Sequence, residues 1–286
     1  MADTSAGPIA LRIVLGHQLR RLREAKEISP EVAARAIRGT KSKISRIELG
    51  RSAVREIDIA DLLTCYGVTD PAAREELLTL AAQASTPGWW HRYSDILPDW
   101  LQTYVGLEQA ARSIRTYEPQ LIPGLLQTEE YASALMALAD FPADQTERRV
   151  ALRKQRQRRF LNGDLYLWAV VDEAALRRQV GRAEVMRGQL GYLLDTARRP
   201  NLTLQVAPLI SAGHAAPGGF SIIRFDDPDL SDMVYAEHLT SALYLDKRAD
   251  VDAYLLTMER LTLISTQPGG ASAEIIEKIL KGTPAP

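Results

Sequence analysis

Residues 28–50 carry two short helical patterns separated by a glycine turn, and this arrangement restricts the possible folds more than any other feature of the chain. Ser29 is a favourable N-cap for the first pattern, and Gly39 is expected to end it. Thr40 is a favourable N-cap for the second pattern, and Gly50 is expected to close it, as a glycine just beyond a helix does. Two short helices joined by a tight turn that contains glycine predict a helix-turn-helix.

The second of these helices, residues 40–49, has the side chains of a recognition helix. Ile44 and Ile47 are three residues apart and are expected to face the core, which leaves the other side polar and cationic. Lys and Arg can bond guanine O6 and N7 in the major groove, and Ser can reach any base edge. Free N–H groups at the helix start can also hold a phosphate. The predicted DNA contacts are Thr40, Lys41, Ser42, Lys43, Arg46 and Arg51.

Three further helical patterns surround this pair. Leucines recur at spacings of three and four over residues 11–22, and two more apolar patterns cover residues 57–66 and 71–81. Together the five helices predict an all-α domain over residues 9–84. Cys65, the only cysteine, cannot form an intrachain disulfide, which favours a reducing cytoplasm, and we expect it to be a small core residue.

Charge is unevenly distributed along the chain. Residues 10–55 hold 12 Lys/Arg and 4 Asp/Glu, net +8, whereas residues 56–84 hold 1 and 6, net -5. Residues 85–286 hold 22 and 25, net -3, and the formal charge of the chain is -1. A +8 segment backed by a -5 segment gives one basic face, which is typical of a small DNA-binding domain. A solvated basic helix face would give the same counts, so charge alone leaves both interpretations open.

The remainder, residues 88–286, is expected to form a larger α/β or α+β domain around one mixed sheet, because short strand patterns are mixed with helical ones. The expected strands are 111–117, 165–171, 202–207, 220–225, 233–237 and 242–245. The expected helices are 128–138, 143–161, 183–197, 249–265 and 272–280. The last strands follow one another closely, which favours an antiparallel meander there.

Two segments of this domain are candidates for a surface that joins domains or receives a ligand or partner. Trp89, Trp90 and Trp100 lie within twelve positions, and they suit either an aromatic pocket or a hydrophobic latch over the linker at 84–88. The loop that follows the first strand supplies the other candidates. They are Glu118, Gln120 and Gln127.

Residues 28–51, ISPEVAARAIRGTKSKISRIELGR, resemble the helix-turn-helix of Cro and phage-repressor regulators, the xenobiotic-response-element class. The resemblance implies a buried pair between Arg23 of the first helix and Glu48 of the third. Two positions depart from the family pattern. Pro30 replaces a polar residue that often touches phosphate, and Arg38-Gly39 stands where Gly-Val is usual.

The rest of the chain carries GWW, YEPQLIPGLLQTEEYA, VVDEAALRR, RPNLTLQV and VYAEHLTSALYLD in this order. These segments are similar to those of a large group of actinobacterial regulators, in which a helix-turn-helix precedes a domain of unknown function. The resemblance implies an antitoxin-like regulator, often encoded beside a small partner protein.

The sequence has few features of an enzyme. Its four histidines lack metal-site spacing, and there is no CxxC, Walker loop or GxGxxG, so we expect no catalytic residues, metal or cofactor. The loop at 213–219 and the pair at 237–238 suit ordinary structural roles better than catalytic ones, and Asp172 is expected to cap a following helix. The basic cluster at 148–159 suits a solvated helix, a contact with the DNA backbone or a docking site for an acidic partner.

These observations predict a sequence-specific DNA-binding transcription regulator that binds double-stranded DNA in the cytoplasm, at the nucleoid. Its second domain is expected to provide self-association as a homodimer and to sense a small-molecule ligand or partner. The alternative is an antitoxin-like protein that neutralises a small partner protein and regulates its own synthesis. No signal peptide and no apolar run of about 18 residues is seen, so no membrane contact is expected.

Overall fold

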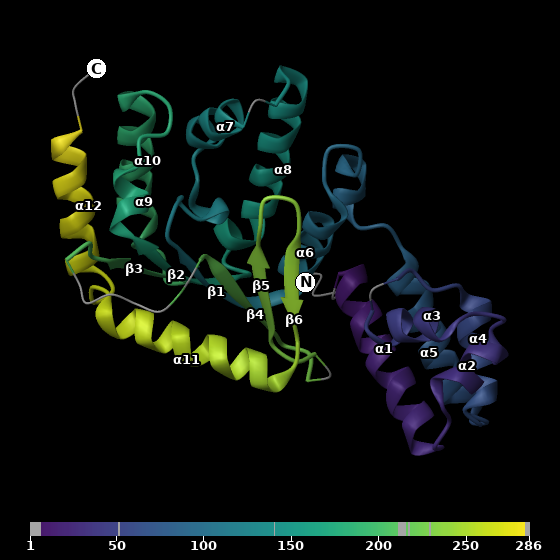
Figure 1. Ribbon diagram of the computed structural model, residues 1–286. Helices are drawn as coiled ribbons and strands as arrows, with labels where there is room; N and C mark the ends of the chain where they lie inside the picture. Colours follow the sequence, from purple (N-terminus) through teal and green to yellow (C-terminus); the bar gives the residue numbers. More distant parts are fainter. Residues whose placement is uncertain are drawn as a thin grey trace. The chain divides into compact units, whose positions relative to one another are not determined.

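The computed structural model describes residues 7–50, 52–139, 141–210, 216, 218–228 and 230–283 (Figure 1). Its internal contacts divide the chain into two compact units. The first unit contains the chain up to Arg92 together with residues 102–110 and 226–230. The second contains residues 93–101 and 111–225 and the chain from Ser231 onward.

The first unit contains the five helices that the sequence predicts. They are α1 (Pro8–Ala25), α2 (Pro30–Ala36), α3 (Lys41–Glu48), α4 (Glu56–Cys65) and α5 (Pro71–Ser85). The predicted caps are present, because Ser29 accepts from the Val32 N–H at 3.3 Å and Thr40 accepts from the Lys43 N–H at 3.2 Å. These bonds satisfy two of the free N–H groups at the helix starts and fix where α2 and α3 begin.

The turn between α2 and α3 differs from the expectation that Gly39 ends α2. Arg38 takes the left-handed conformation, with φ +49°, whereas Gly39 has no positive φ. A Cβ at Gly39 would lie 3.1 Å from the Lys43 side chain and 3.3 Å from the Ile37 side chain, so a larger residue there would require both side chains to shift slightly. Gly50 meets both demands after α3. Its φ is +64°, and a Cβ would lie 2.6 Å from the Ile13 side chain of α1.

An apolar core holds these helices together. Leu15 and Leu19 of α1, Ile44 and Ile47 of α3 and Ile59 of α4 are almost fully buried in it. Burial of each large apolar side chain stabilises the fold by about 1.5–3 kcal/mol, so this cluster is the main support of α3. Cys65 packs partly buried against the same core.

The second unit is built on a six-stranded mixed sheet of order β3-β2-β1-β4-β5-β6. Its strands are β1 (Ala111–Glu118), β2 (Tyr166–Asp172), β3 (Leu202–Ala207), β4 (Phe220–Phe225), β5 (Met233–Glu237) and β6 (Ala242–Leu245). The first three strands are parallel, and β4, β5 and β6 continue the sheet antiparallel. The mixed sheet and its antiparallel meander confirm the fold predicted for this part of the chain.

Helices lie on both sides of this sheet (Figure 1). On one side are those that connect the parallel strands: α7 (Glu129–Leu138), α8 (Ala143–Asn162), α9 (Glu173–Arg177) and α10 (Ala183–Thr196). On the other side α11 (Arg248–Ile264) packs against β3, β4 and β5. The last helix, α12 (Gly270–Gly282), packs beside α10. The predicted cap of α9 is present, because Asp172 accepts from the Ala174 N–H at 2.9 Å.

The remaining helical elements lie on either side of β1 in the sequence. They are the short 3-10 helix η1 (Trp89–Tyr93) and α6 (Asp99–Ala110), with a second 3-10 helix, η2 (Gly124–Leu126), after β1. The sequence interpretation did not include α6. Its residues 102–110 belong to the first unit and its first turn belongs to the second.

Candidate nucleic-acid interface

Helix α3 presents a continuous polar face on the surface of the first unit. Ile44 and Ile47 point into the core, as predicted, and are each 1% exposed. The exposed residues recur at spacings of one and four, so they share one side of the helix. They are Lys41, Ser42, Ser45 and Arg46. Ser45 was not among the predicted contacts, although its spacing from Lys41 could have placed it on this face.

Lys41 is available for contacts outside the unit. Its ammonium lies 2.7 Å from the Glu31 carboxylate of α2, and both side chains are largely exposed. This hydrogen bond lowers the pKa of Glu31. Exposed ion pairs of this kind are weak, because water and salt screen both charges. A phosphate or a base edge can therefore compete with Glu31 for the ammonium.

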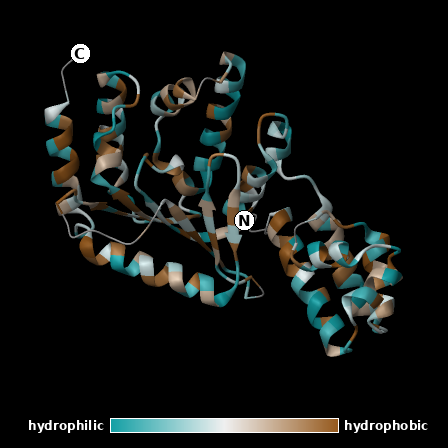
Figure 2. Cartoon of the chain, in the orientation of Figure 1, coloured by the Kyte–Doolittle hydropathy of each residue, from teal (hydrophilic) through white to brown (hydrophobic). Residues whose placement is uncertain are grey.

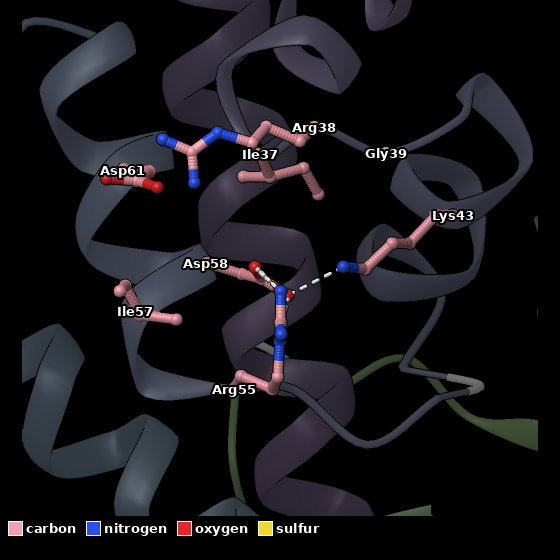
Figure 3. A pocket seen from close by; sticks show the side chains of 8 residues that line it. All are labelled: Ile37, Arg38, Gly39, Lys43, Arg55, Ile57, Asp58 and Asp61. Carbon is pink, nitrogen blue, oxygen red and sulfur yellow. Dashed lines mark hydrogen bonds and ion pairs between the residues drawn. The ribbon is translucent and has the colours of Figure 1, made fainter.

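Lys43 differs from its neighbours on α3, because its side chain turns toward α4. Its ammonium donates to Asp58 Oδ2 at 2.7 Å, and the Lys43 side chain is 30% exposed. Arg55 bonds the same carboxylate, with Nη2 at 2.6 Å from Oδ1 and Nε at 3.1 Å from Oδ2 (Figure 3). Asp58 itself is only 4% exposed, and the Arg55 and Lys43 bonds hold its pKa below the usual value.

A surface cavity of about 220 Å³ lies beside this cluster, between the α2–α3 turn and α4 (Figure 3). Ile37 and Arg38 line it from the turn, and Ile57 and Asp61 line it from α4. The sequence interpretation missed Asp58. It lies 15 residues from Lys43 on another helix, so no local pattern joins the two.

Arg23 and Glu48 form a two-pronged ion pair between α1 and the end of α3. The Arg23 Nε–Glu48 Oε1 distance is 2.6 Å and the Nη2–Oε2 distance is 3.0 Å. Arg23 Nη1 also donates to the Ile28 carbonyl at 2.9 Å, and both charged residues are buried. A two-pronged pair of this kind fixes the orientation of α3 relative to α1.

The matches to known families follow this division of the chain. Residues 14–77 match the family described as "Helix-turn-helix domain". Residues 101–278, more than half of the chain, match "Domain of unknown function (DUF5753)". The chain belongs to the DUF5753 family. Comparisons with curated proteins and with solved structures give no match. The helix-turn-helix match identifies this DUF5753 protein as a DNA-binding regulator.

The three tryptophans predicted near the start of the DUF5753 region are divided between the two units. Trp89 and Trp90 belong to the first unit, where their rings meet edge to face at 5.8 Å and Trp90 is buried. Trp89 Nε1 donates to Gln109 Oε1 at 3.1 Å. Trp100 belongs to the second unit. The burial of Trp90 favours the latch interpretation over an open aromatic pocket.

The loop after β1 separates the other predicted surface residues. Gln120 is exposed, whereas Gln127 is 5% exposed and donates to the Ile122 carbonyl at 2.7 Å. Gln127 also accepts from Arg153 of α8, so it supports the loop from inside and does not belong to a surface. It was among the surface candidates because it lies in the loop after the first strand, and no local pattern shows its contact with Arg153, 26 residues away.

Glu118 stands at the carboxyl end of β1 in a site that disfavours its charge. The pKa of its carboxyl is raised to about 8, first by burial and then by repulsion from Glu237 of β5, while Arg153 partly offsets both. The Tyr235 hydroxyl donates to Glu237 Oε2 at 2.7 Å. The sheet therefore brings together two carboxylates that are 119 residues apart in the sequence.

The basic cluster of α8 is partly used within the second unit. Arg148 forms a two-pronged pair with Asp95 at 2.5 and 2.7 Å, and Lys154 pairs with Glu129 at 2.6 Å. Arg149 donates to the Ile96 carbonyl and stacks over the Phe141 ring at 3.9 Å. Several of these cations therefore have structural contacts within the second unit, which was not among the roles considered from the sequence.

Two predicted features fall outside the described residues: Arg51, and the loop positions 211–215 and 217. Across the residues that the structure does describe, every helix falls short of the combined length and apolarity needed to cross a membrane. The same ranges hold no group of three or more His, Cys, Asp or Glu side chains placed to bind a metal ion.

Proposed function

We propose that this protein is a sequence-specific transcription regulator whose helix α3 reads base edges in the major groove. The observation that carries the proposal is the exposed face of Lys41, Ser42, Ser45 and Arg46 at the start of a capped helix. These are the side-chain types that bond base edges, and the major groove is wide enough to admit a helix. The first N–H groups of α3 and the exposed Thr40 supply a phosphate contact that positions the helix.

We further propose that α11 joins two copies of the chain. Its inner side packs on the sheet through Val251, Met258 and Leu261, which are buried. Its outer side carries a row of exposed residues spaced alternately four and three apart, which is the spacing of the contact positions in a pair of coiled helices. Figure 2 shows apolar and polar residues alternating along this helix. The α11 stripe consists of Ala249, Ala253, Leu256, Arg260 and Leu263.

The α11 stripe is complementary to a second copy of itself. Leu256 and Leu263 are 48% and 83% exposed, which is unfavourable unless another surface covers them. In an antiparallel pair centred on Leu256, Asp252 of each copy comes level with Arg260 of the other, because each lies four residues from the centre. A two-fold interface of this kind would place two α3 helices for paired half-sites.

The antitoxin-like alternative assigns the α11 stripe to a small partner protein. Asp252 pairs with Arg248 of its own helix at 3.6 Å, but both side chains are largely exposed, so this pair is weak and leaves Asp252 able to meet Arg260 of a second copy. The opposite charges placed symmetrically about Leu256 therefore favour a second copy over a small partner protein. For a small-molecule ligand, the proposed surface is the end of β1 with Glu118 and Gln120. Open α/β sheets bind ligands beyond the carboxyl ends of their strands, where the strand order changes direction, and β1 lies at that point.

Selection from a random duplex library tests the proposed function. The full-length protein is expected to enrich a common sequence and to bind it about 10³-fold or more tightly than a scrambled duplex at physiological salt. Two half-sites about 10–10.5 base pairs apart in the enriched sequence would support pairing of two copies. Equal binding to enriched and scrambled duplexes would contradict sequence-specific reading.

A further inference from the structure

We propose that Asp58 determines how specific the protein is for its DNA sequence, by holding Lys43 and Arg55 away from DNA phosphates. The inference rests on the proposed DNA binding by α3. It assigns a positioning role to a buried carboxylate that lies behind the recognition helix and is not part of the exposed face.

The contacts of Lys43 support this role. Lys43 is the third residue of α3, between Ser42 and Ile44, so its backbone lies at the edge of the exposed face. Its side chain leaves that face and reaches Asp58 of α4 at 2.7 Å (Figure 3). The ammonium is therefore committed to a carboxylate within the unit.

Arg55 is bound in the same way from the other side of Asp58. It precedes the first residue of α4 and forms two hydrogen bonds to the carboxylate, at 2.6 and 3.1 Å. Asp58 is nearly inaccessible to water, so solvent and salt screen these pairs less than a surface pair. The Asp58 carboxylate thus partly offsets the charge of two cations, one on α3 and one just before α4.

Free cations at these positions would add affinity without adding specificity. On random DNA no base contact fixes the position of the protein, so it can settle wherever its cations reach phosphates, whereas on the operator the base contacts fix α3 in one position. A free cation at these positions therefore strengthens binding to random DNA more than binding to the operator. A transcription regulator must distinguish its site from a large excess of random sites, and its ratio of affinities matters more than either affinity alone. Withholding two cations improves that ratio.

The surroundings of the cluster give the two side chains room to move once they are released. The neighbouring cavity of about 220 Å³ opens beside Lys43 and Arg55. The Arg55 side chain is already 69% exposed. Loss of the Asp58 charge would therefore leave two cations that can turn to solvent or phosphate without remaining buried and unpaired.

The test compares Asp58→Asn with Asp61→Asn in the full-length protein. Both variants remove one negative charge from the same cavity wall and the same helix, but Asp61 forms no ion pair with Lys43 or Arg55 among the described residues. We measure the salt dependence of binding to a random-sequence duplex and to the enriched sequence. Asp58→Asn is expected to steepen the slope on random DNA by about 0.9 per released cation, hence up to about 1.8.

The same variant should lower the ratio of specific to random affinity several-fold, while Asp61→Asn has less than half the effect on both quantities. Equal effects of the two variants would overturn the proposal, because net charge alone would then explain them. In the double variant Asp58→Asn with Lys43→Gln, the slope on random DNA should be about 0.9 less steep than in Asp58→Asn alone, because one of the two released cations has been removed.

Lys43→Gln alone keeps the proposal testable if Asp58→Asn fails to fold. A withheld Lys43 contacts no phosphate, so this variant should leave the slope on random DNA unchanged. Lys41→Gln on the exposed face should reduce the slope by about 0.9 if Lys41 contacts a phosphate. A reduction of that size for Lys43→Gln would overturn the inference. If the wild-type protein binds no DNA, the proposed function fails and not the role of Asp58 within it.

Discussion

At the scale of single residues, the first unit depends on a charged pair where most folds would place apolar side chains. Arg23 and Glu48 are both buried, and their pairing satisfies charges that would otherwise be costly to remove from water. The pair raises the pKa of Arg23, with the hydrogen bond to Glu48 as the largest cause. Its value lies in fixing α3 against α1 more than in net stability.

Glu48→Gln leaves the Arg23 guanidinium buried with a weaker partner, and Glu48→Ala leaves it without one. We expect Glu48→Ala to lower the free energy of unfolding of the first unit by about 3–5 kcal/mol, because an unpaired buried charge is strongly unfavourable. Denaturant unfolding of the full chain measures this. Glu24→Ala is the matched control, since Glu24 also contacts Arg23 but is half exposed. Similar losses for the two variants would show that burial of the pair is unimportant.

Glu118 gives the second unit a pH dependence of defined sign. Its folded pKa of about 8 lies above its unfolded value, so the folded state binds the proton more tightly. The resulting stability is complete below pH about 4.3 and is lost as the pH rises through 8. Glu118→Gln should therefore stabilise the protein by roughly 1–3 kcal/mol at pH 8.5 and by much less at pH 5. A gain that is equal at both pH values would contradict the buried, protonated carboxyl.

At the scale of elements, local patterning predicted the strands and the main helices because each has the alternation or the periodicity of its type. The turn before α3 was harder to predict. Glycine is the usual left-handed residue, but here Arg38 takes that conformation, and Gly39, without a positive φ, leaves close space to the Lys43 and Ile37 side chains. Helix α6 was missed because its residues, from Asp99 to Ala110, follow an aromatic segment and continue directly into β1 at Ala111.

The candidate site divides in the same way. The exposed side of α3 follows from helical spacing, so most of it could be predicted from the sequence. The position of Lys43 on Asp58 depends on how α3 and α4 pack, and no local pattern contains that information. The interior position of Gln127 likewise depends on Arg153 of α8, which is 26 residues away.

Arg38→Gly tests the element-scale account of the turn. A left-handed conformation costs a residue with a Cβ roughly 1 kcal/mol, so glycine should stabilise the first unit by about 0.5–1 kcal/mol. Arg35→Gly is the control, because Arg35 is exposed within α2 and the same change there should destabilise by a similar amount. Thermal unfolding of both variants checks the opposite signs. Destabilisation by Arg38→Gly would mean that its side-chain contacts outweigh the strain.

At the scale of the whole molecule, the two units have different proposed tasks, which are DNA reading and self-association. One α3 helix covers a single half-site, so high affinity for an operator requires two copies held together. The net charge of -3 over residues 85–286 also means that most of the larger unit adds little attraction for DNA. Pairing through α11 supplies what the first unit lacks.

Leu263→Glu tests this pairing. It should convert a dimer at tens of micromolar into a monomer and reduce operator affinity by orders of magnitude. Leu138→Glu is the matched control, because Leu138 is a 68% exposed leucine at the end of α7, outside the α11 stripe. Sedimentation distinguishes the two. Asp252→Arg and Arg260→Asp should each weaken the dimer, and the double variant should restore it. A wild-type chain that stays monomeric would favour the partner-protein alternative.

The central claim is that the exposed face of α3 reads DNA bases, and Arg46→Ala tests it most directly. The measurement compares the affinity of the variant and of the wild type for the enriched duplex and for a scrambled one, with Arg198→Ala of the second unit as an exposed control. We predict a loss of about 1–3 kcal/mol on the enriched duplex, a much smaller loss on the scrambled one, and no change for Arg198→Ala. Equal losses on both duplexes would show that Arg46 contacts only phosphate, and no loss on either would contradict the assignment of α3 as the recognition helix.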